Sequence, residues 1–396
     1  MMLFEPSIRW RLVAAALCAV LTLAACSAED GDDPDEAAAA PEEGSSSAST
    51  DDPEDPTVEP LPQDGSEDDE TSGPGVAGLP TTAEECAGRG EGSLSLGTIT
   101  FGGMERSVSA PMIAYAEENG LLQAYGIDLE VVENTNPTTM YQEFVSGRYD
   151  VNLGDPIAHA AMAADGVPIR IMGGFNANLT WLVGTDDMEW TGPEVLAGRR
   201  IAVLQGAGGY LLIRAALRQF HDFDIEEEAE TVGAQSPPDA LSQVMAGAAD
   251  VGSSFEVSIS NAIVTNPEAG LVPLYNPNED FAEFTNGETP WQTVLSFRDD
   301  QGADAATVQC LFLAFQEAAE ALNDDVDLLD RLAVEHIGVA EGVYREAVES
   351  GRYVYDVRPM GEDIATDIQA MLEMRREDNS YQGGEVPDSF YEGLTD

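Results

Sequence analysis

Lysine is absent from this chain of 396 residues, so all 17 of its positive charges are arginine. Without lysine there is no side-chain amine to form a Schiff base with a carbonyl substrate or with pyridoxal phosphate, and no Walker-type lysine to hold a nucleotide phosphate. The chain carries 74 acidic residues, for a formal net charge of −57. Because so few cations are present to neutralise a phosphate backbone, we expect no nucleic-acid partner.

Histidine is scarce, with only His159, His221 and His336 in the chain. They are far apart in sequence and none has the H-x-x-x-H spacing typical of a metal site, nor do the cysteines form a C-x-x-C pair. The chain also lacks a G-x-S-x-G nucleophile elbow. We therefore expect no metal, no cofactor and no catalytic activity, and we interpret His159 as a structural or surface histidine.

An uncharged, almost wholly apolar run over residues 12–25 follows two arginines near the N-terminus. It is too short to span a bilayer comfortably and is typical of the core of an export signal. Residues 23–26 read Leu-Ala-Ala-Cys, which matches a bacterial lipobox. Residues 1–25 are thus predicted to be a lipoprotein signal peptide and Cys26 the lipidated N-terminus, which anchors the chain without spanning the membrane. The alternative is ordinary signal cleavage with an incidental Cys26.

Residues 27 to about 90 hold 20 acidic side chains against Arg89 as the only base. Low hydrophobicity and like-charge repulsion leave nothing to offset the entropy of ordering, so this segment is predicted to be extended and disordered. We interpret residues 26–90 as the lipidated cysteine followed by an acidic disordered tether. The domain beyond it is also strongly acidic, and we expect its stability to rise with salt as self-repulsion is screened.

Two cysteines remain beyond the export segment and the lipobox, Cys86 and Cys310. In an exported protein they are a candidate disulfide, which would tie the start of the folded domain to a later helix. Two free thiols are the alternative, and the sequence leaves both open.

From residue 94 onward, short apolar runs alternate with amphipathic stretches. Strands are predicted over residues 94–100, 127–132, 150–153 and 167–173, and helices over 107–125, 140–146 and 157–164, after which 176–184 leads the chain away. A second copy follows, with strands over 200–204, 229–232 and 250–253 and helices over 208–220, 238–246 and 255–264. Strands separated by helices predict parallel sheets.

The two halves share a detail beyond this rhythm. Residues 146–151 (SGRYDV) correspond to residues 246–251 (AGAADV), so that in each half a helix ends on a glycine and Asp-Val opens the next strand. Glycine suits the left-handed position that ends many helices. Two similar α/β halves that face each other predict a ligand cleft between the carboxyl ends of their strands.

Several segments resemble, in collinear order, the solute-binding proteins of ABC importers. Residues 119–132 (NGLLQAYGIDLEVV) are similar to the G-(F/L)-(F/Y)-x3-G-(L/I)-x-V segment of the subgroup that takes up sulfonates, nitrate, taurine or thiamine-precursor pyrimidines. The same family pattern is found at residues 147–151, 154–156, 165–169 and 196–203. In the last of these segments, Arg199 replaces the family's lysine. The resemblance runs from about residue 94 to 300.

This resemblance implies an α/β, two-lobed periplasmic-binding-protein (Venus flytrap) fold, in which each lobe is a mostly parallel sheet flanked by helices. Lobe one would comprise residues 91–176 and 295–396, and lobe two residues 177–294, with the chain returning through 291–297. The implied function is that of an extracytoplasmic lipoprotein on the outer face of the bacterial cell membrane. It would capture a small-molecule ligand and deliver it to an ABC permease, and we expect it to be a monomer.

Ligand-facing residues are expected on both sides of the cleft. They are Phe101, Gly102 and Gly103 in a turn after the first strand, Asp155 and Pro156 after a later strand, Asn176, Asn178 and Trp181 on the outgoing crossover, Gly206, Ala207, Gly208, Gly209 and Tyr210 at a helix start, and Phe255 and Glu256 after a strand. Glycines let backbone approach a ligand, helix starts offer free N–H donors, and aromatic rings stack on planar ligands. Ordinary roles stay open as alternatives: a tight turn, a helix N-cap for Asp155, hinge turns for the asparagines, and core positions for the aromatic residues.

The expected charges of the cleft bear on the ligand. Only Arg106 lies near a predicted site loop, whereas Asp155 and Glu256 supply acceptors. A sulfonate beside two carboxylates would be unfavourable on desolvation, so we favour a neutral or cationic ligand such as an aminopyrimidine thiamine precursor. A sulfonate, taurine or nitrate is the alternative. A pyrimidine-biosynthesis-like enzyme of the same superfamily is less favoured, because the chain has no lysine for the internal aldimine.

Overall fold

A computed structural model describes residues 79–88, 97–285 and 287–394 of the chain. The chain divides into two units, residues 1–71 and 72–396, and the first lies wholly outside the described residues. The predicted signal peptide, Cys26 and most of the predicted tether also lie outside them. The fold is therefore that of the second unit.

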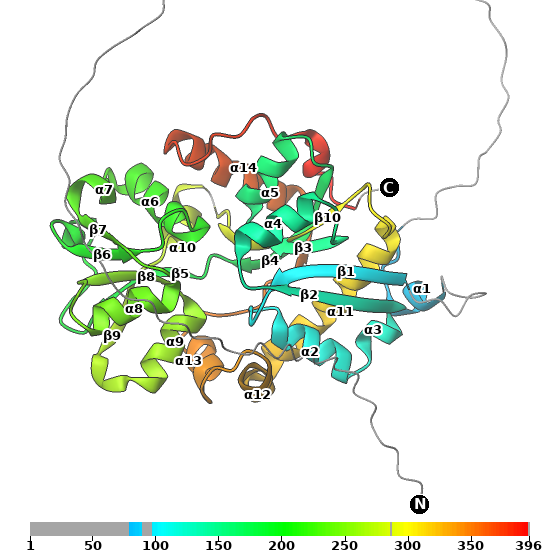
Figure 1. The fold of residues 1–396 in the computed structure, drawn as a ribbon, viewed down its shortest axis with the longest axis horizontal. Coiled ribbons are helices and arrows are strands. Elements are labelled where there is room, and N and C mark those ends of the chain that lie inside the picture. Colours follow the sequence, from blue (N-terminus) through cyan, green and yellow to red (C-terminus); the bar gives the residue numbers. More distant parts are fainter. Residues whose placement is uncertain (1–78, 89–96, 286, 395–396) are drawn as a thin grey trace, which may run out of the picture. The chain divides into compact units, whose positions relative to one another are not determined.

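Two β-sheets organise this unit (Figure 1), and the first has the strand order β11-β4-β10-β3-β1-β2. Its strands are β1 (Gly97–Met104), β2 (Ile127–Asn134), β3 (Val151–Gly154), β4 (Ile169–Ala177), β10 (Trp291–Arg298) and β11 (Arg358–Pro359). Strand β1 pairs in parallel with β2 and β3, whereas β10 runs antiparallel between β3 and β4. We call this sheet and its helices lobe one.

The second sheet has the order β7-β6-β8-β5-β9 and, with its helices, forms lobe two. Its strands are β5 (Thr180–Thr185), β6 (Arg200–Val203), β7 (Glu230–Gly233), β8 (Val251–Phe255) and β9 (Leu271–Tyr275). Strand β6 is parallel to β7 and β8, while β5 is antiparallel to β8 and β9. The prediction of an α/β fold with mostly parallel sheets is confirmed.

Helices flank both sheets. In lobe one they are α1 (Ala83–Gly88), α2 (Ala110–Glu118), α3 (Leu121–Ala124), α4 (Pro137–Val145), α5 (Pro156–Ala164), α11 (Ala305–Asp324), α12 (Val326–His336), α13 (Val343–Glu349), α14 (Glu362–Glu377) and the short 3-10 helix η3 (Asp388–Phe390). In lobe two they are η1 (Pro193–Leu196), α6 (Gly208–His221), α7 (Ile225–Glu228), α8 (Pro237–Met245), α9 (Glu256–Thr265), η2 (Pro267–Ala269) and α10 (Asn278–Phe284). Among the described residues, no helix has both the length and the apolar character needed to cross a bilayer.

The repeated segment seen in the sequence has the same geometry in both lobes. Helix α4 is followed by Gly147 at φ 78° and helix α8 by Gly247 at φ 67°, the left-handed conformation that glycine adopts without strain. Asp150 and Asp250 come next, and the carboxylate of each accepts a hydrogen bond of 2.8 Å from a backbone N–H of the first parallel strand of its lobe, β1 or β6. The same sequence pattern therefore fixes the same strand neighbours twice.

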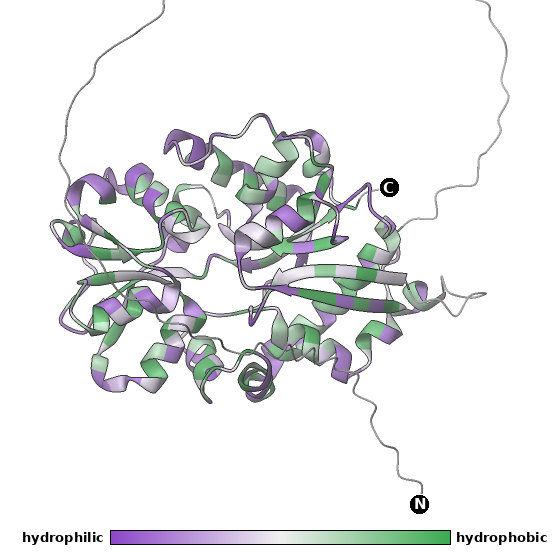
Figure 2. Ribbon diagram, viewed as in Figure 1, coloured by the Kyte–Doolittle hydropathy of each residue, from purple (hydrophilic) through white to green (hydrophobic). Residues whose placement is uncertain are grey.

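The core of lobe one fills both faces of its sheet. On one face, helix α11 contributes a row of buried apolar side chains that includes Phe312 and Phe315. Figure 2 shows hydrophobic and hydrophilic residues interspersed along the helices and strands of both lobes. Full burial of each such phenylalanine contributes about 1.5–3 kcal/mol, so α11 is a major source of the stability of this lobe.

The two lobes are joined by two chain segments. The chain leaves lobe one after β4 through Asn178 and Leu179, and it returns between α10 and β10. The predicted return at 291–297 is therefore wrong, as is the predicted boundary of lobe two at residue 294. Trp291 already begins β10, whose side chains are mostly buried between β3 and β4. The apolar run of this strand belongs to the core of lobe one.

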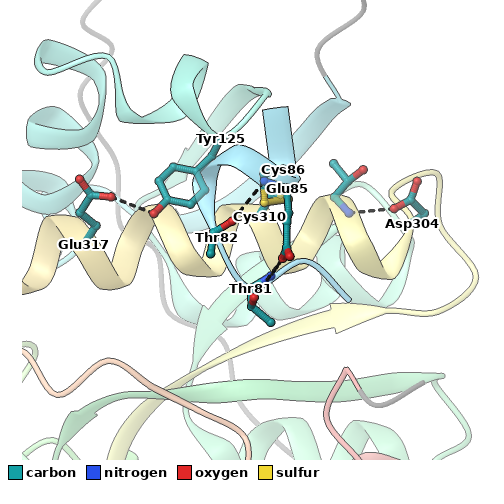
Figure 3. Close-up of a disulfide and its surroundings, with 9 residues drawn as sticks. Thr81, Thr82, Glu85, Cys86, Tyr125, Asp304, Cys310 and Glu317 are labelled. Carbon is teal, nitrogen blue, oxygen red and sulfur yellow. Dashed lines mark hydrogen bonds between the residues drawn. A yellow bond between two sulfur atoms is a disulfide. The ribbon is translucent and has the colours of Figure 1, made fainter. Parts of the chain in front are cut away.

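A disulfide joins Cys86 in α1 to Cys310 in α11 across 224 residues of sequence (Figure 3). Beside it, the Tyr125 hydroxyl donates a 2.8 Å hydrogen bond to Glu317 of α11. Cys86 is buried and packs in the lobe-one core. The predicted disordered tether thus extends too far, because residues 83–88 form a helix that is covalently attached to the domain.

Candidate ligand-binding site

A narrow hollow, with no room for a water molecule in this closed arrangement, lies between the lobes. Lobe one lines it with Asp155, Trp291, Gln292 and Met371, lobe two with Gly208, Gly209 and Leu212, and the outgoing crossing with Asn178. Asp155 follows β3, and Gly208 begins the helix after β6. The hollow therefore lies at the carboxyl ends of parallel strands from both sheets, where ligands bind in open α/β folds.

Asp155 combines the two roles that its position in the sequence allows. Its Oδ1 accepts hydrogen bonds of 2.8 and 2.9 Å from the backbone N–H groups of Ile157 and Ala158, which caps α5. Its Oδ2 faces Gly208 of lobe two. Burial raises the pKa of Asp155, while the nearby Arg375 and the two capping hydrogen bonds oppose that rise. A buried carboxylate whose second oxygen faces the opposite lobe can bind a donor or a cation from a ligand.

The start of α6 approaches the other side of the hollow. Gly206 adopts φ 83°, and Ala207 is an N-cap without a side-chain hydrogen bond. A Cβ at Gly208 would lie 2.0 Å from Asp155 Oδ2, and a Cβ at Gly209 would lie 1.9 Å from Thr180 Oγ1. Both glycines are therefore needed for close approach of this helix, and the N–H groups of its first turn lie near the hollow.

Helix α14 also reaches the site, and nothing in the sequence predicted this contact. Met371 lines the hollow, and one turn later Arg375 is 4% exposed. Its Nη1 donates to the Gly208 carbonyl across the lobes at 3.3 Å, and its Nε donates to Ser380 at 2.6 Å. Burial lowers the pKa of Arg375, while Asp155 and Asp378 oppose that shift. A basic residue near the end of an amphipathic helix has no local signal that distinguishes it from a surface residue.

Trp291 is a second residue that lines the hollow without having been predicted to do so. It is almost fully buried, and its Nε1 donates a 2.9 Å hydrogen bond to Asp367 of α14. Burial raises the pKa of Asp367, while hydrogen bonds from Thr289 and Trp291 oppose the rise. The ring lies against Gly174 of β4, where an added Cβ would come within 2.3 Å of it. Trp291 was expected on the return crossing and instead forms one wall of the hollow.

The predicted ligand-binding turn at residues 101–103 is wrong. Phe101, Gly102 and Gly103 lie inside β1, and Phe101 packs in the core edge-to-face against Phe315 at 5.9 Å between ring centroids. A Cβ at Gly102 would lie 2.2 Å from the Tyr149 ring. The glycine is needed so that Tyr149 can pack on the strand, and the apolar run simply continues to Met104.

Several other predicted contacts do not line the hollow, among them Gly206, Ala207 and Phe255. Pro156 is a buried first-turn residue of α5. Asn176 is buried and donates to the Val354 carbonyl at 3.3 Å. Trp181 packs against one apolar cluster of lobe two and Tyr210 lies within another, so both are core residues. Asn178, in contrast, lines the hollow, and its amide donates to the Thr180 carbonyl at 3.3 Å.

Glu256 was expected to face the ligand after Phe255, the last residue of β8. It is fully buried, and its Oε2 lies 2.9 Å from Nε of Arg352 in lobe one. The Ser260 hydroxyl donates to its other oxygen at 2.5 Å. Burial raises the pKa of Glu256, while Arg352 opposes the rise. Glu256 therefore pairs with a cation of the opposite lobe, and the hollow holds one acidic residue, not two.

His159 belongs to a buried network in lobe one, as a structural histidine. Its Nε2 lies 2.9 Å from Asn152 Oδ1, and its Nδ1 lies 2.8 Å from Ser296 Oγ. All three side chains are fully buried, and burial lowers the pKa of His159 to about 3. The ring is therefore neutral at physiological pH and links α5 to β3 and β10.

Within the described ranges, one group of three side chains has the spacing of metal ligands. It consists of Glu118, Glu335 and His336, whose ligand atoms lie within 4.8 Å of one another. Arg331 contacts both glutamates at 3.5 Å, so their charge is already compensated by a cation. The group lies on the outer ends of α2 and α12 and contributes nothing to the hollow.

Comparison with known proteins agrees with this geometry. Residues 108–260 match the family model described as NMT1/THI5 like. The periplasmic aliphatic sulphonate-binding protein SsuA from Escherichia coli superposes with a TM-score of 0.59 at 16% identity, over 74% of this chain and 90% of its own. An ABC transporter protein from Parabacteroides distasonis gives 0.58 at 16% identity, over 74% and 98%. A DszB mutant in complex with biphenyl-2-sulfinic acid gives 0.51 at 17% identity, over 75% and 96%. No curated protein sequence matches the chain.

The matched segment begins just before α2 in lobe one and ends within α9 in lobe two, so it includes both Asp155 and the start of α6. The resemblance inferred from the sequence is thereby confirmed. The described chain has the two-lobed fold of periplasmic solute-binding proteins, and its residues 108–260 are similar to the NMT1/THI5-like family.

Proposed function

We propose that this protein is the extracytoplasmic solute-binding component of an ABC importer. It captures a small molecule in the hollow between its lobes and presents the closed form to a membrane permease. The observation that supports this most is that the two lobes line one hollow from opposite sides, with Asp155 facing the start of α6. A ligand that touches both lobes favours closure, because its contacts are complete only in the closed form.

The proposed ligand is neutral or cationic and planar, such as an aminopyrimidine. Asp155 offers a buried carboxylate oxygen to an amine or a ring N–H, and the Trp291 ring offers an apolar wall. Trp291 is the aromatic residue at the hollow, in place of Trp181 and Tyr210, and the Arg358 guanidinium lies over its ring at 4.8 Å from the centroid. Arg106, the cation expected near the site, has a side chain that is 70% exposed and lies beside Glu105.

A sulfonate is the second candidate, because the guanidinium of Arg375 could pair with its negative charge. This guanidinium is buried at the contact between the lobes and lies one helical turn from Met371 of the hollow. The first turn of α6 adds N–H donors with a positive partial charge. A small sulfonate that also carries an amine would use both Arg375 and Asp155.

The proposed attachment to the membrane is a lipid on Cys26 followed by the acidic segment as a spacer. The disulfide between Cys86 and Cys310 supports export, because such bonds persist in oxidising compartments. A tether keeps the binding protein near its permease and so raises its effective concentration there. Mass spectrometry of the membrane fraction tests this, since a lipidated N-terminal peptide beginning at Cys26 is expected and a free cysteine there would contradict it.

A thermal-shift screen tests the proposed function. It would compare a hydroxymethyl-aminopyrimidine, polyamines, taurine, alkanesulfonates and nitrate at low and high salt, and calorimetry would follow the hits. We expect the aminopyrimidine to raise the melting temperature and to bind with 1:1 stoichiometry, because a ligand bound only by the folded state stabilises it. Stabilisation by sulfonates alone selects the second candidate. Chemical conversion of the bound ligand, detected by mass spectrometry, would contradict a binding role.

A further inference from the structure

We infer that two buried ion-pair clusters, one on each flank of the contact between the lobes, form a latch that holds the lobes closed. The Asp378 cluster consists of Asp378, Arg214 and Arg218, and the Glu256 cluster consists of Glu256, Arg352 and Ser260. The inference rests on the proposed function only in requiring that the lobes open and close. Glu256, which the sequence predicted to contact the ligand, has this conformational role instead.

The Asp378 cluster joins α6 of lobe two to the end of α14 in lobe one. Asp378 is the residue that ends α14, and its side chain is only 2% exposed. Arg214 donates to its Oδ2 through Nε at 3.0 Å and through Nη2 at 2.6 Å. Arg218, one turn along α6, donates to Oδ1 at 2.5 Å. One buried carboxylate thus binds two guanidinium groups of the opposite lobe.

The Glu256 cluster joins α9 of lobe two to the segment after α13 in lobe one. Arg352 Nε lies 2.9 Å from Glu256 Oε2, and its Nη2 donates to the Ser260 hydroxyl at 3.2 Å. On the same flank, the Asn261 side chain accepts from the backbone N–H of Ala340 at 3.2 Å. This flank therefore combines a charged pair with two further hydrogen bonds between the lobes.

The two clusters lie on different helix pairs. Helices α6 and α14 pack together on one flank, and α9 and α13 on the other, as Figure 1 shows at the upper and lower parts of the domain. The hollow lies beside the first pair, since Leu212 of α6 and Met371 of α14 both line it. Separation of the lobes at the hollow would therefore break the Asp378 cluster directly.

Most of these charges keep a partner within their own lobe when the lobes separate. Arg214 contacts Glu226 at 3.0 Å, and Arg218 contacts Asp224, both in lobe two. Arg352 lies 3.3 Å from Glu346 in lobe one. On opening, each arginine therefore loses one carboxylate partner and keeps the other, so none is left unpaired. This lowers the cost of opening and gives the domain two states in which most of these charges are satisfied.

The test is the distance between the lobes, measured without ligand. Spin labels would be placed at Val145 of α4 and Met245 of α8, which are 40% and 38% exposed, through V145C and M245C in full-length protein with C18S and C26S. The native disulfide leaves Cys86 and Cys310 unreactive toward the label. Pulsed dipolar spectroscopy then reports the populations of short and long distances.

We expect D378N and R352Q each to raise the ratio of open to closed molecules about tenfold or more, because removal of one partner from a buried charge pair is strongly unfavourable. The matched control is D327N, which removes an exposed carboxylate paired with Arg345 inside lobe one at 2.7 Å. It should leave the distances unchanged. Circular dichroism checks that each variant is folded, and R218Q, which alters a side chain 37% exposed, replaces D378N if that variant unfolds.

Folded variants of both clusters with the wild-type distance distribution would overturn the latch. So would an equal shift in D327N, since that would show a general effect of lost charge. The latch and the proposed function fail independently, because the distances are measured without ligand. If the variants open but no small molecule binds the wild type, the latch stands and the proposed function fails. If a ligand binds 1:1 and no variant changes the distances, the proposed function stands and the latch fails.

Discussion

Asp155 and Gly208 meet across the hollow so closely that a Cβ at Gly208 would lie 2.0 Å from the Asp155 carboxylate. One residue caps a helix of lobe one, and the other begins a helix of lobe two. The contact therefore exists only when the lobes are together. A substitution at either residue should therefore change closure of the lobes without disturbing the core of either lobe.

The change Gly208→Ala should hold the lobes apart. We expect a folded protein whose affinity for its ligand falls at least tenfold, because the added methyl group and the Asp155 carboxylate cannot occupy the same space. Calorimetry measures the affinity, and the melting temperature reports folding. The control is Gly233→Ala in β7, where an added Cβ meets nothing within 4 Å. Wild-type affinity in the Gly208 variant would show that closure at this point is not required.

The change Asp155→Asn should separate function from stability. Burial raises the pKa of Asp155 above its ordinary value of 3.8, so the ionised form costs folding free energy that grows as pH rises through the raised pKa. Asparagine keeps an oxygen to cap α5 and carries no charge. We expect a higher melting temperature than wild type at pH 7, a smaller difference below pH 4, and weaker binding of a cationic ligand. A variant that is less stable than wild type at pH 7 would contradict this account.

His159 should make the protein sensitive to acid. Its pKa is lowered by burial from 6.5 to about 3, so between these values the unfolded chain binds a proton that the folded chain does not. The stability it contributes is present above pH 6.5 and is lost as pH falls, by about 3 kcal/mol between pH 7 and pH 4. Urea unfolding at several pH values should show a smaller loss in His159→Gln than in wild type. Parallel curves for the two proteins would contradict the prediction.

The disulfide should stabilise the domain by holding α1 against α11. Replacing Cys86 and Cys310 together by serine is expected to lower the free energy of unfolding by about 2–4 kcal/mol, since the bond closes a long loop in the unfolded chain. Hydrogen exchange should rise first over residues 83–88, which form a short helix. Cys26→Ser is the control because Cys26 lies outside the bond. An unchanged unfolding curve in the double variant would show that the bond contributes little.

Much of the fold could be predicted because its signals are local. The repeat at Gly147 and Gly247 could be recognised in the sequence itself. In both lobes the glycine ends a helix, and the Asp-Val that follows places the next strand beside the first parallel strand. The start of α6 was predicted for a related reason, since clustered glycines before an amphipathic helix allow close backbone approach. Asp155 was correctly expected to be an N-cap or a cleft residue, and it is both.

The rest of the site depends on packing between segments that are distant in sequence. Gly102 looked like a turn glycine because nothing local reveals that the Tyr149 ring packs over it. Glu256 looked like a free acceptor because its partner, Arg352, is 96 residues away. Trp291 and Arg375 reach the hollow only because β10 and α14 return to lobe one. The sequence predicted almost no cations near the cleft, and this was wrong because Arg375 comes from the distant helix α14. One argument against an anionic ligand is thereby lost.

The central claim is that one small molecule contacts both lobes at once. The most direct test is calorimetric titration of the best ligand from the thermal-shift screen into the wild type, Asp155→Asn, Gly208→Ala and the control Gly233→Ala. We predict 1:1 binding to the wild type and the control, and an affinity at least tenfold lower in each of the other two, which alter opposite sides of the hollow. Wild-type affinity in either of those two variants would contradict the claim.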